Sequence, residues 1–571
     1  MPLSTSLNLT KLFLSLTKTD EITKPIINDL DPEKPYVNEK DKSSHLLRVD
    51  PESMGIKLEY IQSFINEVEN DDTIIMNRFM LIKDDKVLYE YVNKPYDLNS
   101  WNACFSLTKT TVGLAIGMLY DEGKIKLTDK AYDILLDKKP ITNPINKTIT
   151  IEQLLTMSTG IKFNESTSAV SKTWIKDIFN SGNKFKPGTS FEYNSLNTYI
   201  LSAIVKKVSG QSLSKYLKKR LFDPLEIKSY YYSLSPENIE CGGWGLYITP
   251  EAMAKLGILI KNDGVYNGVR LISKEWIDLM SHERRDSKNA SSLYNYGYQM
   301  WANDKNNICL FNGLFDQDIV IYRNTGIVCV WCCSNSDAFH TNNIHKIAEK
   351  YFSKEIPIKY RKVNAYGYKE TINDETLMHH FKHINGYEFI PLSKKANGVS
   401  ILPIFIQATM STFLSGFSSI RFSKDEFNYY MHFTQKDESY DIPFNFEDGI
   451  RQTIKIYGNS YDCNVDAKFK RDDEDYPYLL IRICFLEFAS DRFIKIHFTK
   501  KRNIVTLSFS ENPSRDFVLS LIDVQDDKTK RFLKSVSSIV SMDTLYSRLD
   551  GILTPHFDAE RIKYEDNSKE K

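Results

Sequence analysis

The chain lacks the features that would place it in several specialised classes of protein. No run of about 18 apolar residues occurs, so no membrane-spanning helix is predicted. The short apolar segment LFLSL is followed by Lys18 and Asp20 without a small-residue cleavage site, which is too little for a secretory signal. Neither sign of charge predominates, because 74 basic residues balance 74 acidic ones. The sequence therefore predicts no nucleic-acid partner and no attraction to an anionic membrane.

Paired cysteines and metal-binding clusters are also missing. The eight cysteines are scattered, and several lie in apolar runs such as GIVCVWCCS. We expect buried free thiols in a reducing compartment, which predicts a cytoplasmic protein. Cys329 and Cys332 have a metal-like spacing, yet no second pair or nearby histidine accompanies them, and a strand would point them to opposite faces. We therefore predict no metal and no cofactor.

The length and composition of the chain are typical of a globular protein with more than one domain, each with its own hydrophobic core. It has 571 residues, of which 42% are hydrophobic and 26% are charged. Residues 1–47 are polar and lysine-rich, and we expect them to form a flexible arm. Residues 48–355 carry strand-like segments at both ends of a long helical section, which predicts an α/β to α+β domain. The polar residues 356–384 are predicted to be a linker.

Residues 385–560 have a different texture, with short alternating, aromatic-rich segments separated by turn residues. This pattern predicts an all-β barrel or sandwich. A helix is expected at 530–553, and the chain from 558 onward is expected to fray. The predicted strands are 398–407, 419–425, 426–434, 452–459, 460–469, 478–488, 491–500 and 503–512.

The pentapeptide SLTKT occurs twice, at Ser15–Thr19 and Ser106–Thr110. A serine and a lysine three residues apart face each other only on a helix, and the lysine becomes a base only when burial disfavours its ammonium form. The first copy is followed by the polar TDEITKP, which cannot continue as a buried helix. After Lys109 the chain reads TTVGLAIGMLYDEG, which is apolar nearly all round.

Two readings of this second copy follow from the residues alone. Ser106 and Lys109 are either polar residues at the exposed start of a core helix or a nucleophile with its base. The helix N-terminus would favour developing negative charge near Ser106. Gly113 and Gly117 would permit close approach of another backbone.

Several segments, in order, make residues 48–352 resemble the serine hydrolases related to class C β-lactamases, a family that includes D-alanyl-D-alanine peptidases, carboxylesterases and 6-aminohexanoate-dimer hydrolases. The resemblance implies a β-lactamase/transpeptidase-like domain, with an antiparallel sheet flanked by helices and a helical subdomain. It is carried by DPESMGIKLEYIQSFINEV, FSLTKTTVGLAIGMLYDEGKIKLTDKAYDIL, TIEQLLTMSTGI, FKPGTSFEYNSLNTYILSAIVKKVSG and GWGLYITPEAMAKLGILI. The C-terminal strands resemble, more loosely, the lipocalin-like β-barrels that some members carry.

The resemblance implies that Ser106 is the nucleophile and that Lys109 activates it. The family's second element, a tyrosine followed two residues later by asparagine or serine, matches Tyr193 and Ser195 in FEYNSLN. A phenol near a lysine can lose its proton more readily and act as a base or proton shuttle. From the residues alone, Tyr193 could instead simply end a loop ahead of an amphipathic helix.

The family's third element, Lys-Thr-Gly or His-x-Gly beside the nucleophile, is degraded. Against the Gly-His-Gly-Gly-Gln of many relatives, the chain has Gly313, Leu314, Phe315, Asp316 and Gln317. This strand can still offer a backbone N–H to an oxyanion, but it lacks a cation for the substrate. We expect Gly313, Phe315 and Gln317, together with Ser195, to contact the substrate.

The sequence thus predicts a serine hydrolase that acts on an ester, amide or β-lactam carbonyl of a small molecule or short peptide, through an acyl-enzyme on Ser106. The alternative, motivated by the degraded third element, is a catalytically weak or inactive relative that serves as a binding or scaffolding module.

Overall fold

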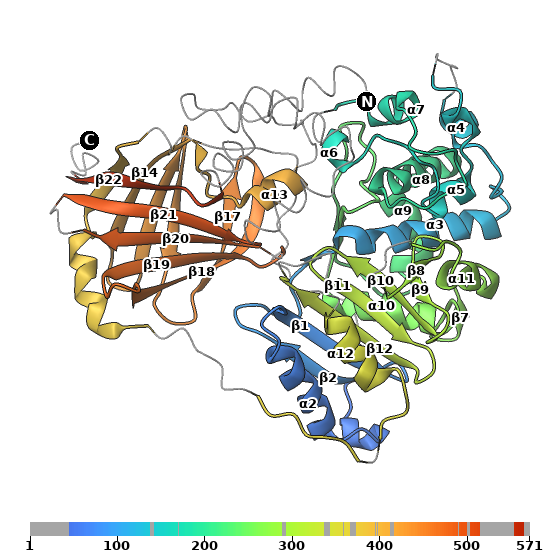
Figure 1. Ribbon diagram of the computed structural model, residues 1–571, viewed down its shortest axis with the longest axis horizontal. Helices are drawn as coiled ribbons and strands as arrows, with labels where there is room; N and C mark the ends of the chain where they lie inside the picture. Colours follow the sequence, from blue (N-terminus) through green and yellow to red (C-terminus); the bar gives the residue numbers. More distant parts are fainter. Residues whose placement is uncertain are drawn as a thin grey trace. The chain divides into compact units, whose positions relative to one another are not determined.

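The computed structural model describes residues 45–564 except for twelve gaps. The chain divides into two compact units (Figure 1). One unit holds the described part of residues 28–368, and the other holds that of residues 369–571. The expected N-terminal arm up to residue 44, the first SLTKT copy and the predicted helix up to residue 552 lie outside the described residues. The gaps are 137–141, 169–170, 288–292, 336–342, 358, 366–372, 394–395, 397, 411–415, 489, 500–502 and 514–552.

An antiparallel sheet organises the first unit, in the order β2-β1-β12-β11-β10-β9-β8. Strands from the two ends of the unit pair directly, because β1 lies beside β12, and this confirms a sheet assembled from distant parts of the chain. The strands are β1 (Met76–Lys83), β2 (Lys86–Val92), β8 (Asn295–Tyr296), β9 (Trp301–Asn303), β10 (Ile308–Gly313), β11 (Gln317–Tyr322) and β12 (Ile327–Cys333).

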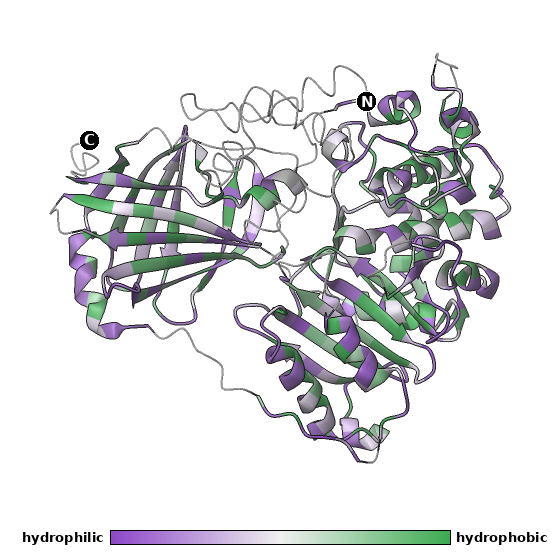
Figure 2. Cartoon of the chain, in the orientation of Figure 1, coloured by the Kyte–Doolittle hydropathy of each residue, from purple (hydrophilic) through white to green (hydrophobic). Residues whose placement is uncertain are grey.

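Both faces of this sheet are covered, so its central strands are buried along nearly their whole length and are mostly hydrophobic (Figure 2). Alternate residues of β1 point to opposite faces: Phe79 belongs to the core under α2 (Leu58–Glu69) and α12 (Asn343–Phe352), whereas Met80 belongs to the larger core on the other side. That larger core is built from helices α3 (Thr108–Asp121), α4 (Ala131–Leu135), α5 (Ile151–Leu155), α7 (Trp174–Asn180), α8 (Ser195–Ser209), α9 (Leu213–Leu217), α10 (Pro250–Lys261) and α11 (Lys274–Ser281).

Shorter elements complete the first unit. One small sheet, in the order β3-β5-β4, contains the strand β3 that comes just before the helix carrying Lys109. These elements are β3 (Asn102–Ala103), β4 (Tyr230–Tyr232), β5 (Leu246–Ile248), β6 (Val265–Tyr266), β7 (Val269–Arg270), α6 (Glu165–Ser168), the 3₁₀ turns η1 (Pro51–Met54), η2 (Phe105–Leu107) and η3 (Asn146–Thr148), and the π-helical turn η4 (Lys218–Phe222).

The second unit is a nearly closed antiparallel barrel in the order β16-β15-β14-β13-β22-β21-β20-β19-β18-β17, in which the end strands β16 and β17 approach each other. The elements are the 3₁₀ helix η5 (Glu375–His383), β13 (Tyr387–Pro391), α13 (Ile404–Thr409), β14 (Phe417–Lys424), β15 (Tyr429–Gln435), β16 (Glu438–Phe444), β17 (Ile450–Ile456), β18 (Asn459–Arg471), β19 (Pro477–Phe485), β20 (Ser490–Phe498), β21 (Ile504–Asn512) and β22 (His556–Lys563).

Two predictions for this unit were wrong. The segment 398–407 was expected to be a strand, but its second half begins the helix α13, directly after Pro403. A short apolar run does not distinguish a buried strand from a buried helix. The chain after residue 558 was expected to fray, but β22 lies inside the sheet between β13 and β21. Its inward residues, Phe557 and Ala559, are buried and alternate with exposed residues. The strand was missed because most of its other residues are charged.

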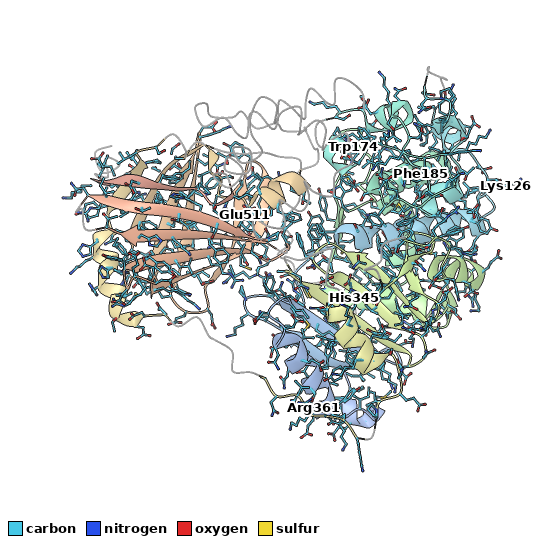
Figure 3. All side chains as sticks on the ribbon, in the orientation of Figure 1. Lys126, Trp174, Phe185, His345, Arg361 and Glu511 are labelled. Atoms are coloured by element: carbon cyan, nitrogen blue, oxygen red, sulfur yellow. The ribbon has the colours of Figure 1, made fainter. Side chains whose placement is uncertain are left out.

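Buried polar side chains of the barrel hold the segment before α13. Gln435 accepts the backbone N–H of Ile401, and Arg492 donates to the carbonyl of Leu402. Glu511, labelled in Figure 3, accepts the N–H of Ile404. These backbone partners compensate only part of the burial of the three side chains, because Gln435 Nε2, Arg492 Nε and Nη1, and Glu511 Oε1 have no hydrogen-bond partner among the described residues, although Arg492 Nη1 lies 3.3 Å from Glu511 Oε2. None of the helices in the described part of the chain has the length and apolar character that crossing a membrane requires.

We predict that Gly117→Ala destabilises the first unit. A Cβ at this position would lie 2.2 Å from the indole of Trp276, so α3 and α11 would have to separate, at a cost of about 1–3 kcal/mol. Urea unfolding followed by tryptophan fluorescence measures this unit alone, because all six tryptophans lie within it. Gly182→Ala is the control, since its nearest atom would be 3.6 Å away. Equal midpoints for both variants would contradict the packing seen here.

Candidate active site

Ser106 lies in a tight turn between the small sheet and the long helix α3. The turn η2 follows β3, and Phe105 adopts a left-handed backbone conformation with φ of 45°, which is costly for a bulky side chain. Ser106 is partly exposed, whereas the residues on both sides of it are buried. The fold therefore leaves the Ser106 hydroxyl accessible to solvent, while the neighbouring residues at the start of the helix are buried.

Lys109, one turn further along, points back at this hydroxyl. Its Nζ lies 2.7 Å from Ser106 Oγ and also donates to the carbonyl of Gly243 at 2.7 Å. The side chain is 1% exposed. Burial lowers the pKa of Lys109 to about 7, although the negative charge of Glu165 acts in the opposite direction. A substantial fraction of this amine is therefore neutral near pH 7 and can accept a proton.

The second partner of Lys109 depends on a glycine. A Cβ on Gly243 would lie 2.7 Å from the Cβ and from the carbonyl oxygen of Ser195. Only glycine therefore lets this segment pass close to the start of α8, where its carbonyl reaches Lys109. A carbonyl holds the amine in place without a negative charge, so it stabilises the ammonium form less than a carboxylate would.

Tyr193 covers the lysine from the other side. Lys109 Nζ lies 4.7 Å from the centre of the Tyr193 ring, and the phenol is close enough to Ser106 for that hydroxyl to lower its pKa. Trp301 stacks on the same ring, with centroids 5.6 Å apart. The expectation that the lysine would make the phenol more acidic was wrong, because burial raises the pKa of Tyr193 above its usual value. Tyr193 is therefore a neutral hydrogen-bonding group.

Ser195 is the first residue of α8, and the helix start is fixed by its neighbours. The side chain of Asn194 accepts the N–H of Leu196 and donates to the carbonyls of Ile161 and Phe163. The backbone N–H of Ser195 donates to Glu165 Oε1 at 2.8 Å. This bond places a carboxylate beside the helix N-terminus, close enough to affect the pKa of Lys109.

The hairpin β10–β11 brings the degraded third element against the turn of Ser106. A Cβ on Gly313 would lie 2.4 Å from the carbonyl of Cys104, so glycine is required for this approach. Phe315, at the hairpin turn, packs edge-on against Phe105 at 5.8 Å. The N–H of Gly313 already donates to Asp318, so another N–H of the turn would have to serve an oxyanion.

Gln317 lies beside this turn, but its amide is used within the protein. It accepts from Asn102 at 2.9 Å and donates to the carbonyls of Phe315 and Cys333. The structure thus brings Ser106, Lys109 and Tyr193 into mutual contact, and it places Gln317 where it supports the hairpin. The substrate contacts expected of Ser195, Gly313, Phe315 and Gln317 stay predictions.

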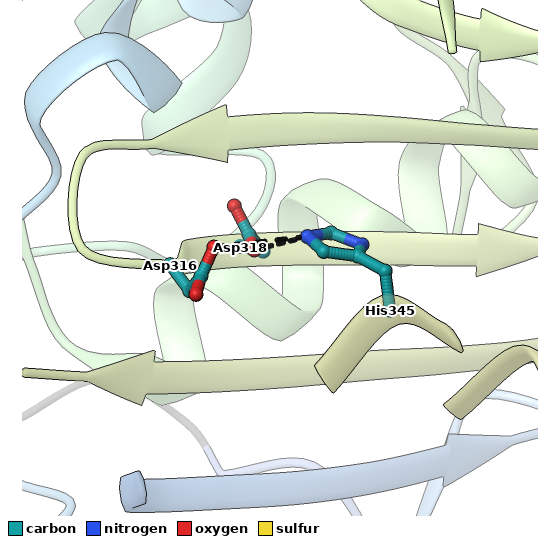
Figure 4. Close-up of side chains that lie close together, drawn as sticks. All are labelled: Asp316, Asp318 and His345. Atoms are coloured by element: carbon teal, nitrogen blue, oxygen red, sulfur yellow. Dashed lines mark ion pairs between the residues drawn. The ribbon is translucent and has the colours of Figure 1, made fainter. Parts of the chain in front are cut away.

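A cluster of charged side chains also holds the β10–β11 hairpin, on the side of the sheet that α12 covers (Figure 4). His345 Nε2, on α12, lies 3.1 Å from Asp318 Oδ2 and 3.9 Å from Asp316 Oδ1. Their ligand atoms are close enough for a metal ion. Asp318 also accepts hydrogen bonds from Asn312, Gly313 and Trp331, so several donors of the protein already bind its two carboxylate oxygens.

Two contributors to the site escaped the sequence analysis. The carbonyl of Gly243 has no side-chain signature, although the close pair Gly242 and Gly243 was a signal that another backbone passes nearby. Glu165 lies 56 residues beyond Lys109 in an unremarkable polar stretch, and only the fold places it next to Ser195.

Residues 77–349, just under half of the chain, match the family model described as Beta-lactamase. Protein flp of Staphylococcus aureus strain COL is 35% identical over 130 residues, which cover 21% of this chain and 26% of that protein. The 6-aminohexanoate-dimer hydrolase of Paenarthrobacter ureafaciens is 22% identical over 259 residues, covering 40% of this chain and 65% of the hydrolase. The chain thus spans about a quarter of the length of the first of these relatives.

Among solved structures, FmtA from Staphylococcus aureus is similar with a TM-score of 0.43 and 19% identity, covering 57% of this chain and 97% of FmtA. The expected β-lactamase/transpeptidase-like fold, with its antiparallel sheet flanked by helices, is confirmed for the first unit.

We predict that the charge cluster makes the first unit less stable as the pH rises. His345 faces Asp318, Asp316 and Glu349; burial lowers its pKa, but the hydrogen bond to Asp318 and these negative charges outweigh burial and raise it. The hydroxyl of Tyr294, a neutral group, lies 3.4 Å from His345 Nδ1. A histidine whose pKa is higher in the folded protein than in the unfolded chain stabilises the folded state. Its full contribution is present below the pKa of the unfolded chain, about 6.5, and is lost as the pH rises through the pKa of the folded protein.

The measurement is the urea midpoint of tryptophan fluorescence between pH 6 and pH 9. The advantage of the wild type over His345→Gln should shrink across this range. A constant difference between the two proteins would show that His345 does not titrate with folding.

Proposed function

We propose that the Beta-lactamase-family domain at residues 77–349 is a serine hydrolase that works through an acyl-enzyme on Ser106. The observation that carries this proposal is the 2.7 Å contact between Ser106 Oγ and the buried amine of Lys109. Burial gives that amine a pKa of about 7, so it is a base of suitable strength at neutral pH. The similarity to a dimer hydrolase supports the same reaction class.

In the proposed reaction, Lys109 takes the proton of Ser106 as Ser106 Oγ attacks the carbonyl carbon. The backbone N–H of Ser106, at the start of a helical segment, and one N–H of the turn 314–316 would stabilise the oxyanion. The leaving group departs with a proton that Lys109 returns through Tyr193, whose phenol lies next to Ser106. Water then releases the acyl group by the same route in reverse.

Tyr193 is proposed to relay and donate rather than to act as the base. A phenol whose pKa is raised above its usual value keeps its proton near neutral pH, whereas the pKa of Lys109 is about 7. The difference between the two environments assigns the base role to the lysine. Stacking on Trp301 and the contact with Lys109 hold the ring in position.

The charges around the site favour an ester or amide that is neutral, or positively charged, near its carbonyl. Glu165 places a negative charge beside Ser195. Arg323, a cation on the chain just after β11, is bound to Asp263 and Ser281 at the far end of that strand. Asp316 is bound to Asn335 and near His345, so its charge is partly compensated. A carboxylate on the substrate would thus meet repulsion from Glu165.

We predict that a fluorophosphonate probe labels Ser106 and that p-nitrophenyl esters are hydrolysed. Ser106→Ala should abolish labelling at this position and steady-state hydrolysis of the ester, because it removes the nucleophile. Lys109→Ala and Tyr193→Phe should each reduce kcat/KM, Lys109→Ala by about 10²- to 10⁴-fold, since general acid–base catalysis is lost. Peptide mass spectrometry of the labelled protein and ester kinetics provide the measurements.

Ser15→Ala is the matched control, because it removes the serine from the other SLTKT copy. Turnover of the ester by Ser106→Ala at the wild-type rate would contradict the assignment. Absence of labelling and turnover in the wild type would instead favour the inactive binding module.

We further predict that Glu165→Gln shifts the pH profile of kcat/KM. The rate should rise with pH as Lys109 loses its proton, with a midpoint of about 7 in the wild type. Because Glu165 raises this pKa, its neutral isostere should move the midpoint to lower pH. The same variant should improve kcat/KM for a cephalosporin relative to a neutral aryl ester. An unchanged midpoint and unchanged substrate preference would exclude this role of Glu165.

A further inference from the structure

A second serine, outside the site described above, is held by a histidine and an aspartate on the C-terminal barrel. Ser423, His432 and Asp441 come from the neighbouring strands β14, β15 and β16. His432 lies directly opposite Asp441 in the β15–β16 register, and Ser423 lies diagonally across the β14–β15 pair. The adjacent residues Phe422, Met431 and Ile442 are buried, so the three polar side chains share the outward face. Their positions are thus set by strand pairing.

The hydrogen bonds run in one direction through the imidazole. Ser423 Oγ lies 2.8 Å from His432 Nε2, and Asp441 Oδ1 lies 2.5 Å from His432 Nδ1. A carboxylate can only accept, so Nδ1 carries a proton and the neutral ring has its lone pair on Nε2. In that tautomer the histidine accepts the hydroxyl proton of Ser423. The arrangement matches the nucleophile, base and orienting group of a serine triad.

The histidine is held on a second side by an aromatic contact. Tyr430, two residues earlier on β15, lies nearly parallel to the imidazole with ring centroids 6.2 Å apart. Its hydroxyl donates to Asp425 at 2.9 Å, and Asp425 also accepts the backbone N–H groups of Phe427 and Asn428. The turn between β14 and β15 therefore fixes the ring that flanks His432.

We propose that Ser423 is a second nucleophilic serine, which accepts acyl groups from activated esters. In this step Ser423 Oγ bonds to the carbonyl carbon of the ester while its proton passes to His432 Nε2. Asp441 stabilises the imidazolium that forms. The ester C–O bond then breaks, and the leaving phenolate or alkoxide takes the proton from His432, so the net reaction transfers the acyl group to Ser423 and releases an alcohol.

The surroundings limit which acyl donors react. β15 lies between β14 and β16, so the backbone N–H groups around His432 are used in the two ladders. Oxyanion stabilisation therefore falls to side chains, of which Arg421, directly opposite His432, is the cation placed nearest by register. The side chain of Asp441 is 75% exposed, so the site is open to solvent. These conditions suit single-step acylation by esters with good leaving groups.

The test uses the full chain carrying Ser106→Ala, so that the site proposed on the first unit cannot contribute. The protein is treated with p-nitrophenyl acetate, and acetylation of each serine is followed over time by peptide mass spectrometry. Ser439 is the internal control, because it lies on the same outward face of β16 but bonds to Thr434. We expect Ser423 to be acetylated about 10²-fold faster than Ser439, the lower end of what a general base contributes.

Two variants, His432→Gln and Asp441→Asn, should each bring the rate at Ser423 down toward that of Ser439. The second variant keeps the imidazole and changes only its orienting partner, so it separates activation from simple loss of a side chain. Acetylation of Ser423 at the rate of Ser439, or a rate at Ser423 that neither variant changes, would overturn the proposal. Neither result bears on Ser106, because that serine is absent from the protein tested.

Discussion

The first unit is organised around keeping one lysine amine out of water. Lys109 can have a pKa of about 7 only while the protein around it stays dry and offers it a hydroxyl and a carbonyl as its hydrogen-bond partners. That requirement explains the apolar surface of α3 on nearly every side, the glycine that brings a backbone carbonyl past α8, and the aromatic ring of Tyr193 over the charge.

Sequence reasoning favoured the SLTKT copy at Ser106 because the deciding property, burial of the helix that follows, can be read from consecutive residues, and α3 is indeed buried along nearly its whole length. The turn of the β1–β2 hairpin is also a local feature, because the neighbouring residues Asp84 and Asp85 both adopt left-handed backbone conformations. Contacts between residues that lie far apart in the sequence could not be predicted from it. Glu165 reaches the site through a contact with a distant backbone N–H, and β22 is recognisable as a strand only from its neighbours in the sheet.

The pKa of Tyr193 shows how the same residues can support opposite expectations. A nearby cation lowers the pKa of a phenol, whereas burial raises it. The sequence does not show which of these two effects is larger at Tyr193. In the structure burial prevails for both groups, lowering the pKa of the lysine and raising that of the tyrosine. Desolvation thus shifts the pKa values of two neighbouring groups in opposite directions, and among the described residues the hydrogen-bond partners of the amine are a hydroxyl and a carbonyl.

The place of β22 in the barrel has a consequence for how the chain is made. This strand, from residues 556–563, separates β13 from β21 in the sheet order, so a ribosome must have released it before the barrel can complete its hydrogen bonds. In the first unit the last strand to pair, β12, ends at Cys333. The sheet of the first unit can therefore be completed before the barrel strands are made, whereas the facing edges of β13 and β21 stay unpaired until β22 has been synthesised, and unpaired strand edges favour aggregation.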